Sequence, residues 1–93
     1  MTLTEFKKLN KDSGRCWFDT ETMRHFSTEI EFWDAAGGFF VTSEKFNRMD
    51  PKTYTVRMAD FNSGRVQTVG EFRQENSLQD AVNRIIEFKK DGK

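Results

Sequence analysis

The chain contains little of the chemistry on which metal centres and nucleophilic enzymes depend. Among its 93 residues there is one cysteine, Cys16, and one histidine, His25. A tetrahedral structural zinc site is built mostly from Cys and His side chains, and one of each cannot complete it. The acidic residues also lack the Asp-x-Asp-x-Asp-Gly spacing of a calcium-binding loop. We therefore expect no metal site and no other cofactor.

Long apolar runs and an excess of either charge are missing as well. No stretch approaches the ~20 apolar residues of a membrane-spanning helix, and the first residues are too polar for a targeting peptide. Fifteen Lys and Arg balance fifteen Asp and Glu, so no overall field draws the chain to a polyanion. A single cysteine excludes an internal disulfide. These features predict a cytoplasmic protein that does not contact membranes.

Aromatic side chains are the abundant apolar material. The chain has ten Phe, two Trp and one Tyr, although only 35% of its residues are hydrophobic. Each aromatic side chain can bury roughly 150–250 Å², so we expect an aromatic-rich core. The length suits one domain, spanning residues 1–93.

The clearest structural pattern runs from Tyr54 to Phe88. Residues 54–59 and 65–72 alternate between apolar and polar side chains, and the Asn-Ser-Gly between them is typical of a hairpin. Ser77 then resembles a helix N-cap. The residues after it form one apolar stripe at helical spacing: Leu78, Ala81, Val82, Ile85 and Ile86. Such a stripe must cover a sheet, with residues 66 and 72 facing the helix.

The first half predicts a helix followed by another hairpin. Thr2 and Glu5 form a capping-box pattern at the start of a short helix, Leu3–Asn10. Residues 28–33 alternate as a half-buried strand, and residues 39–46 follow a glycine-containing turn. The predicted fold class is α+β: an antiparallel β-meander of about four strands packed by a C-terminal amphipathic helix and a short N-terminal helix. We expect the helices on one side of the sheet.

Protein binding is the leading functional hypothesis. Trp33 is predicted on the strand face opposite its apolar neighbours, alongside Glu29 and Glu31, and Phe40 is out of phase with the residues on either side. These side chains form either a second small core under the N-terminal helix or an exposed aromatic and acidic patch, of the kind enriched at interfaces. We take the four residues as the candidate protein-binding surface of a non-catalytic accessory module.

Nucleic-acid binding is the alternative. Arg57, Arg65 and Arg73 are predicted on strand faces opposite the apolar rows, and Lys52 precedes the first of these strands. On an open sheet face they would resemble the basic rows of β-ribbon proteins that enter a major groove. Glu71 on the same side and the neutral total charge weigh against this alternative.

An enzyme is the third hypothesis. Cys16 would have to act with His25, nine residues later, as a nucleophile and its base. The flanking residues do not match a nucleophile elbow or a cysteine-protease signature. We therefore expect the protein not to be an enzyme.

Two resemblances follow from these motifs. The segment "GRVQTVGEF…SLQDAVNRI" resembles the end of plant AP2-type DNA-binding domains, which implies DNA contact through the sheet. The segments "FDTETMRHFSTEI", "GGFFVTSEKF" and "YTVRMADFNSGRVQTVGEF" are similar to small uncharacterised proteins encoded by phages and prophages. This second likeness covers about Trp17 to Phe88. It implies only a cytosolic accessory protein of unassigned role, and it assigns no functional residues. If the likeness holds, we expect a host or phage protein as the partner, with inhibition of a host-defence nuclease as one such role.

Overall fold

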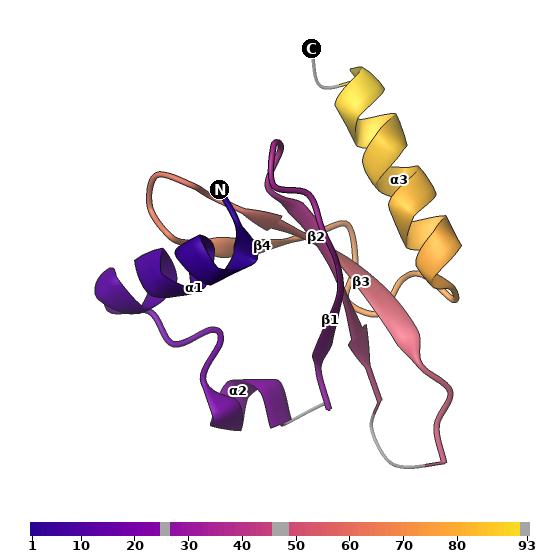
Figure 1. Cartoon of the computed structure of the whole chain (residues 1–93). Coiled ribbons are helices and arrows are strands. Elements are labelled where there is room, and N and C mark those ends of the chain that lie inside the picture. The colour runs from indigo at the N-terminus through magenta and orange to yellow at the C-terminus, as the bar shows by residue number, and fades with distance from the viewer. Residues whose placement is uncertain (25–26, 46–48, 92–93) are drawn as a thin grey trace.

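The computed structural model describes residues 1–24, 27–45 and 49–91. Four antiparallel strands form one sheet in the order β1-β2-β3-β4, with helices before and after it (Figure 1). The elements in chain order are α1 (Leu3–Asp12), α2 (Thr20–Arg24), β1 (Glu29–Trp33), β2 (Phe39–Glu44), β3 (Thr53–Ala59), β4 (Val66–Val69) and α3 (Leu78–Asp91). The predicted α+β meander with an N-terminal and a C-terminal helix is confirmed.

The helices lie on both faces of the sheet, so the expectation of helices on one side is wrong. Helix α3 packs on one face, and α1 and α2 lie on the other (Figure 1). On the α3 face, Ala81 and Ile85 pack against Val41 and Val56. On the α1 face a separate cluster of buried residues consists of Phe6, Phe40 and Ala59. The number of aromatic side chains explains the second layer, since strand residues alternate between faces and one core cannot receive them all.

A β-bulge in β1 decides which face receives Trp33. The pairing of β1 with β2 shifts between Ile30 and Phe32, so that Glu31 is the extra residue. A bulge of this kind breaks the alternation of side chains along the strand. Ile30 and Trp33 consequently share the aromatic core on the α1 face, whereas Phe32 packs on the α3 face. The prediction that Trp33 lies opposite Ile30 and beside the two acidic residues is therefore wrong.

Both long helices begin at the predicted caps. The Thr2 hydroxyl accepts a hydrogen bond from the Glu5 backbone N–H, and the Glu5 carboxylate accepts one from the Thr2 backbone N–H. The Ser77 hydroxyl accepts from the backbone N–H of Asp80 at the start of α3. These bonds satisfy amide groups that the first turn of a helix leaves unpaired. Helix α1 runs two residues beyond the predicted end.

Strand β4 is shorter than predicted, and its faces are reversed. It ends at Val69, because Gly70 has a φ of 78° that extended backbone does not adopt. Val69 pairs with Val56 and packs on the α3 face, whereas Val66 belongs to the α1-side core. The chain then returns toward β3 through a loop of residues 70–75. Phe72 lies in this loop and not in a strand facing α3.

Candidate functional site

The four residues of the predicted protein-binding surface do not form one surface. Phe40 is completely buried, and Trp33 is half-buried with its ring centroid 5.2 Å from that of Phe40. The Trp33 indole N–H donates to the backbone carbonyl of Met1. Glu29 and Glu31 lie elsewhere, where both carboxylates accept from the Lys52 ammonium. The interpretation of the aromatic pair as a second core under the N-terminal helix is the one that the structure supports.

The predicted basic residues are likewise separated. Arg57 is buried, and its guanidinium pairs with Glu44. Arg73 is half-buried with a φ of 59°, and its Nε–H donates to the Thr53 hydroxyl. Arg65 is exposed in the turn before β4, and Lys52 pairs with the acidic residues of β1. These four side chains therefore do not line one open sheet face.

The pair of the enzyme hypothesis lies only partly within the residues that the structure describes. Cys16 is an exposed thiol between α1 and α2, and His25 lies outside the described residues. Within the described residues no group of three or more His, Cys, Asp and Glu side chains could hold a metal ion.

A buried polar network underlies the part of the sheet that α1 does not cover. The Glu44 side chain is fully buried, and its carboxylate accepts from the Thr55 hydroxyl at 2.7 Å and from Arg57 Nη2 at 3.4 Å. Arg57 Nε donates to the Thr42 hydroxyl, and Nη1 donates to the Thr68 hydroxyl at 2.6 Å. Burial lowers the pKa of Arg57, and the Glu44 carboxylate opposes this effect. Because arginine stays charged in proteins, the pair is a salt bridge.

Sheet register places these groups together. Thr42 pairs with Thr55 and Phe40 pairs with Arg57 across β2 and β3, while Thr68 of β4 pairs with Arg57 from the other side. Paired residues point to the same face, so a threonine on each neighbouring strand flanks the guanidinium. Thr68 lies beside Arg57 because the two faces of β4 are reversed relative to the prediction.

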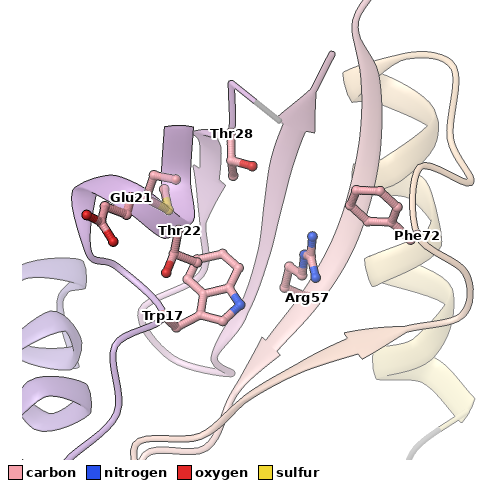
Figure 2. Close-up of a pocket in the computed structure, with 7 residues that line it drawn as sticks. Trp17, Glu21, Thr22, Thr28, Arg57 and Phe72 are labelled. Carbon is pink, nitrogen blue, oxygen red and sulfur yellow. The ribbon is translucent and has the colours of Figure 1, made fainter. Parts of the chain in front are cut away.

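A cleft lies directly over Arg57, and we call it the α2 cleft (Figure 2). Its volume is about 490 Å³. Its described lining comes from the segment containing α2, from the residue before β1, from β3 and from the loop after β4: Trp17, Glu21, Thr22, Met23, Thr28, Arg57 and Phe72. Helix α2 has only five residues and none of them is buried. A helix this short covers little of the sheet, which leaves the hollow beside it.

Two aromatic rings stand on opposite sides of the cleft floor (Figure 2). The centre of the Arg57 guanidinium is 5.4 Å from the Trp17 ring centroid and 5.5 Å from that of Phe72, within cation–π distance of both. Trp17 is braced from behind by Phe18 and Phe40 at edge-to-face angles. Phe72 is 42% exposed, so one wall of the cleft is open to solvent.

The loop that carries Phe72 is held by backbone contacts. Tyr54 and Glu75 exchange two backbone hydrogen bonds as an isolated bridge. The backbone N–H of Arg73 donates to the Thr55 hydroxyl at 2.9 Å, next to the buried carboxylate. Gly70 starts the loop, where a Cβ atom would lie 2.5 Å from Gln74 Oε1. The aromatic wall is thus positioned by the same network that fixes the floor.

Sequence reasoning placed one residue of this cleft, Arg57, in a candidate binding surface, and gave it a different role. Trp17 and Phe72 were not proposed for a site. Trp17 lay outside the predicted apolar rows, whereas Phe72 was assigned to the strand face under the helix. Glu44 was also detectable, as an acidic residue in the middle of a β-rich segment, where burial requires a cationic partner.

Comparison with known proteins identifies the family of the chain. Residues 2–86 match a family of unknown function, DUF7447, so the chain belongs to that family. No curated protein and no solved structure matches it. Through the described part of the chain, none of the helices has the length and apolar character needed to span a membrane.

Proposed function

We propose that this protein is a non-catalytic binding module that acts in the cytoplasm and captures a protein partner through an anchor residue in the α2 cleft. The observation that carries the proposal is an unfilled cleft of about 490 Å³ between two aromatic walls, one of them the 42% exposed Phe72. Binding hot spots concentrate in pockets that accept a large side chain and exclude water. The volume also falls within the range usual for ligand sites.

A protein partner fits the charges better than a nucleic acid does. Nucleic-acid binding depends on Lys and Arg side chains that are free to neutralise phosphates, which releases the counterions condensed on the nucleic acid. The cation at the cleft floor, Arg57, is paired with Glu44, and Lys52 is paired with Glu29 and Glu31. The cleft also exposes the carboxyl group of Glu21. The resemblance to phage and prophage proteins supports a host protein as the partner, with inhibition of a host-defence protein as one such role.

The test is capture from host lysate followed by mass spectrometry, with three versions of the protein. The wild type should retain a defined protein that Phe72→Ala loses. Phe88→Ala is the matched control, since Phe88 is a comparably exposed phenylalanine on α3, outside the α2 cleft. If both variants retain the partner equally, the cleft is not the interface. Capture of nucleic acid that disappears as salt is raised would replace the proposal with the nucleic-acid alternative.

A further inference from the structure

The donors of Arg57 are not all used within the protein. A guanidinium carries N–H groups on Nε and two on each Nη. One bond from each nitrogen is made to the described residues, to Thr42, Thr68 and Glu44 respectively. One N–H on each Nη atom therefore has no partner in the described part of the chain. The Arg57 side chain is 10% exposed and lines the α2 cleft.

The charge of this floor is already balanced. Glu44 is fully buried behind Arg57 and neutralises it. A ligand carboxylate or phosphate would add a second negative charge beside the same guanidinium in a cleft with apolar walls, and its desolvation would be poorly compensated. A neutral oxygen can accept from Nη without this cost. The floor is thus suited to an uncharged acceptor.

The walls require that the acceptor be carried on a ring. Trp17 and Phe72 offer aromatic surfaces, and Met23 adds a thioether, which packs well against aromatic rings. Among the described residues, the rest of the lining is polar and contains acceptors, namely the Glu21 carboxylate and the Thr22 and Thr28 hydroxyls. The Thr22 hydroxyl donates its proton to the Cys16 carbonyl, which leaves its lone pairs available.

We propose that the α2 cleft recognises a tyrosine side chain of the partner protein. The phenol ring packs between Trp17 and Phe72, and its oxygen accepts from the Nη groups of Arg57. Its hydroxyl proton is donated to the polar wall. A phenylalanine would fill the same space and leave the Arg57 donors unpaired, which costs affinity in a buried site. This inference rests on the proposed function and specifies its anchor.

The test uses small probes, with the two indole N–H signals read by NMR. The probes are the neutral blocked amino acids N-acetyltyrosinamide and N-acetylphenylalaninamide, the anion 4-hydroxyphenylacetate, and guanosine. Trp33 lies in the core, outside the cleft lining, so its signal serves as the internal control. We expect the tyrosine probe to shift the Trp17 signal with a dissociation constant in the millimolar range, as its size implies. It should bind about ten-fold more tightly than the phenylalanine probe.

Two variants guard against an effect of misfolding. Phe72→Ala should weaken both blocked amino acids, because it removes a wall. Thr28→Val, which retains the shape of the side chain, should weaken the tyrosine probe and leave the phenylalanine probe unchanged. Arg57 itself is not substituted, because its removal would leave the buried Glu44 carboxylate without a cationic partner.

Each other outcome overturns the inference. Equal affinity for the two blocked amino acids, tighter binding of 4-hydroxyphenylacetate, tighter binding of guanosine, or no shift of Trp17 at about 20 mM probe would each exclude a tyrosine anchor. The proposed function fails separately. If Phe72→Ala loses the lysate partner while the probes fail, the cleft binds a partner through another anchor. If the probes behave as expected and Phe72→Ala retains the partner, the partner binds elsewhere.

Discussion

The two faces of the sheet are closed by different chemistry. On the α3 face, aliphatic side chains of the helix pack on the valines of β2 and β3. On the other face, rings cluster around Phe6 and Phe40, and beside them lies the Glu44–Arg57 pair with its threonines. Apolar side chains fill space in many combinations, whereas a buried ion pair needs one arrangement of partners. The comparison teaches that the α3 face is an apolar packing surface, whereas the other face combines an aromatic core with a defined polar site.

The difference between the covering helices has a consequence for function. Helix α3 has 14 residues, and its apolar side chains pack against β2 and β3. Helix α2 has five residues, none of them buried, and leaves a cleft beside it. The loop with Phe72 crosses to this side and supplies the other wall. The hollow therefore lies where a short helix meets a polar sheet surface.

The largest effect is expected from removing one member of the buried pair. Glu44→Ala leaves the Arg57 guanidinium without its counter-charge and should lower the free energy of unfolding by about 3–5 kcal/mol. Urea denaturation followed by circular dichroism measures this loss. A loss below about 1 kcal/mol would mean that water reaches the pair and that the floor is not sealed.

A double substitution separates charge from packing on this face. Glu44→Leu combined with Arg57→Met replaces the pair by apolar groups, and it should recover much of the stability lost by Glu44→Ala. It should also abolish the discrimination between tyrosine and phenylalanine probes. Persistence of that discrimination would show that Arg57 does not recognise the phenol.

The α3 face should respond through volume alone. Ile85→Ala removes buried methyl groups from a side chain that is 3% exposed, and a loss of about 2–5 kcal/mol is typical. Ile85→Val should cost only about 0.5–1.5 kcal/mol. Denaturation of the two variants gives these values, and probe binding in the α2 cleft should stay unchanged in both. Weaker probe binding in either variant would mean that the two faces are coupled through the sheet.

Much of the fold was predictable from local patterns. The caps at Thr2 and Ser77 depend on residues close in sequence, and both were confirmed. Most of the α3 stripe also packs as predicted, through Leu78, Ala81 and Ile85, whereas Ile86 is exposed. The bulge at Glu31 and the end of β4 at Gly70 were missed, because they depend on pairing between strands. Each feature changes the face that a side chain reaches, so missing them gave wrong predicted positions for Trp33 and Phe72.

The candidate site was less predictable than the fold. The α2 cleft combines Trp17, Arg57 and Phe72, which lie far apart in the sequence and meet only in the folded chain. Arg57 appeared to be an exposed cation because its partner Glu44 belongs to another strand. The available signal was the position of Arg57 in the middle of a predicted strand, and a charge buried there needs a partner that the sequence does not name.

The two helix caps offer a matched and smaller comparison. Thr2→Ala and Ser77→Ala each remove a hydroxyl that accepts from a first-turn amide. Each should lower the free energy of unfolding by about 1 kcal/mol. Hydrogen exchange should show the Thr2 variant losing protection in α1 and the Ser77 variant in α3. Loss across the whole chain in either case would contradict the view that the faces are closed separately.

A smaller effect is expected at the end of α3, where it meets the β1–β2 turn. The Asp34 side chain is 11% exposed and faces the Lys89 ammonium. Burial raises the pKa of Asp34, but Lys89 and the backbone N–H groups of Gly37 and Ala36 outweigh it, and the net pKa is lowered. The stabilisation of the fold by the Asp34 carboxylate is therefore present above its unfolded-state pKa of about 3.9. It is lost as the pH falls through the lower folded-state pKa.

Comparison with Asp34→Asn isolates this contribution from those of other carboxylates. Wild type should be more stable than the variant at neutral pH by up to about 1 kcal/mol, and the difference should vanish in acid. Urea denaturation at pH 7 and below pH about 3 measures it. A stability difference between wild type and variant that is constant with pH would show that the contribution of Asp34 does not depend on its charge.

The smallest effect on stability, and the most informative for function, is expected at Phe72. Its side chain is 42% exposed, so Phe72→Ala should change the free energy of unfolding by about 0.5 kcal/mol or little more, as surface substitutions do. Partner affinity should nevertheless fall about 30-fold or more, the range of an interface hot spot. Denaturation and a binding titration on the same samples measure the two quantities, with Phe88→Ala as the control that should alter neither strongly. A parallel loss of stability and affinity would reassign Phe72 to the core of its face. Loss of affinity without loss of stability would show that the Phe72 ring contacts the partner and contributes little to folding.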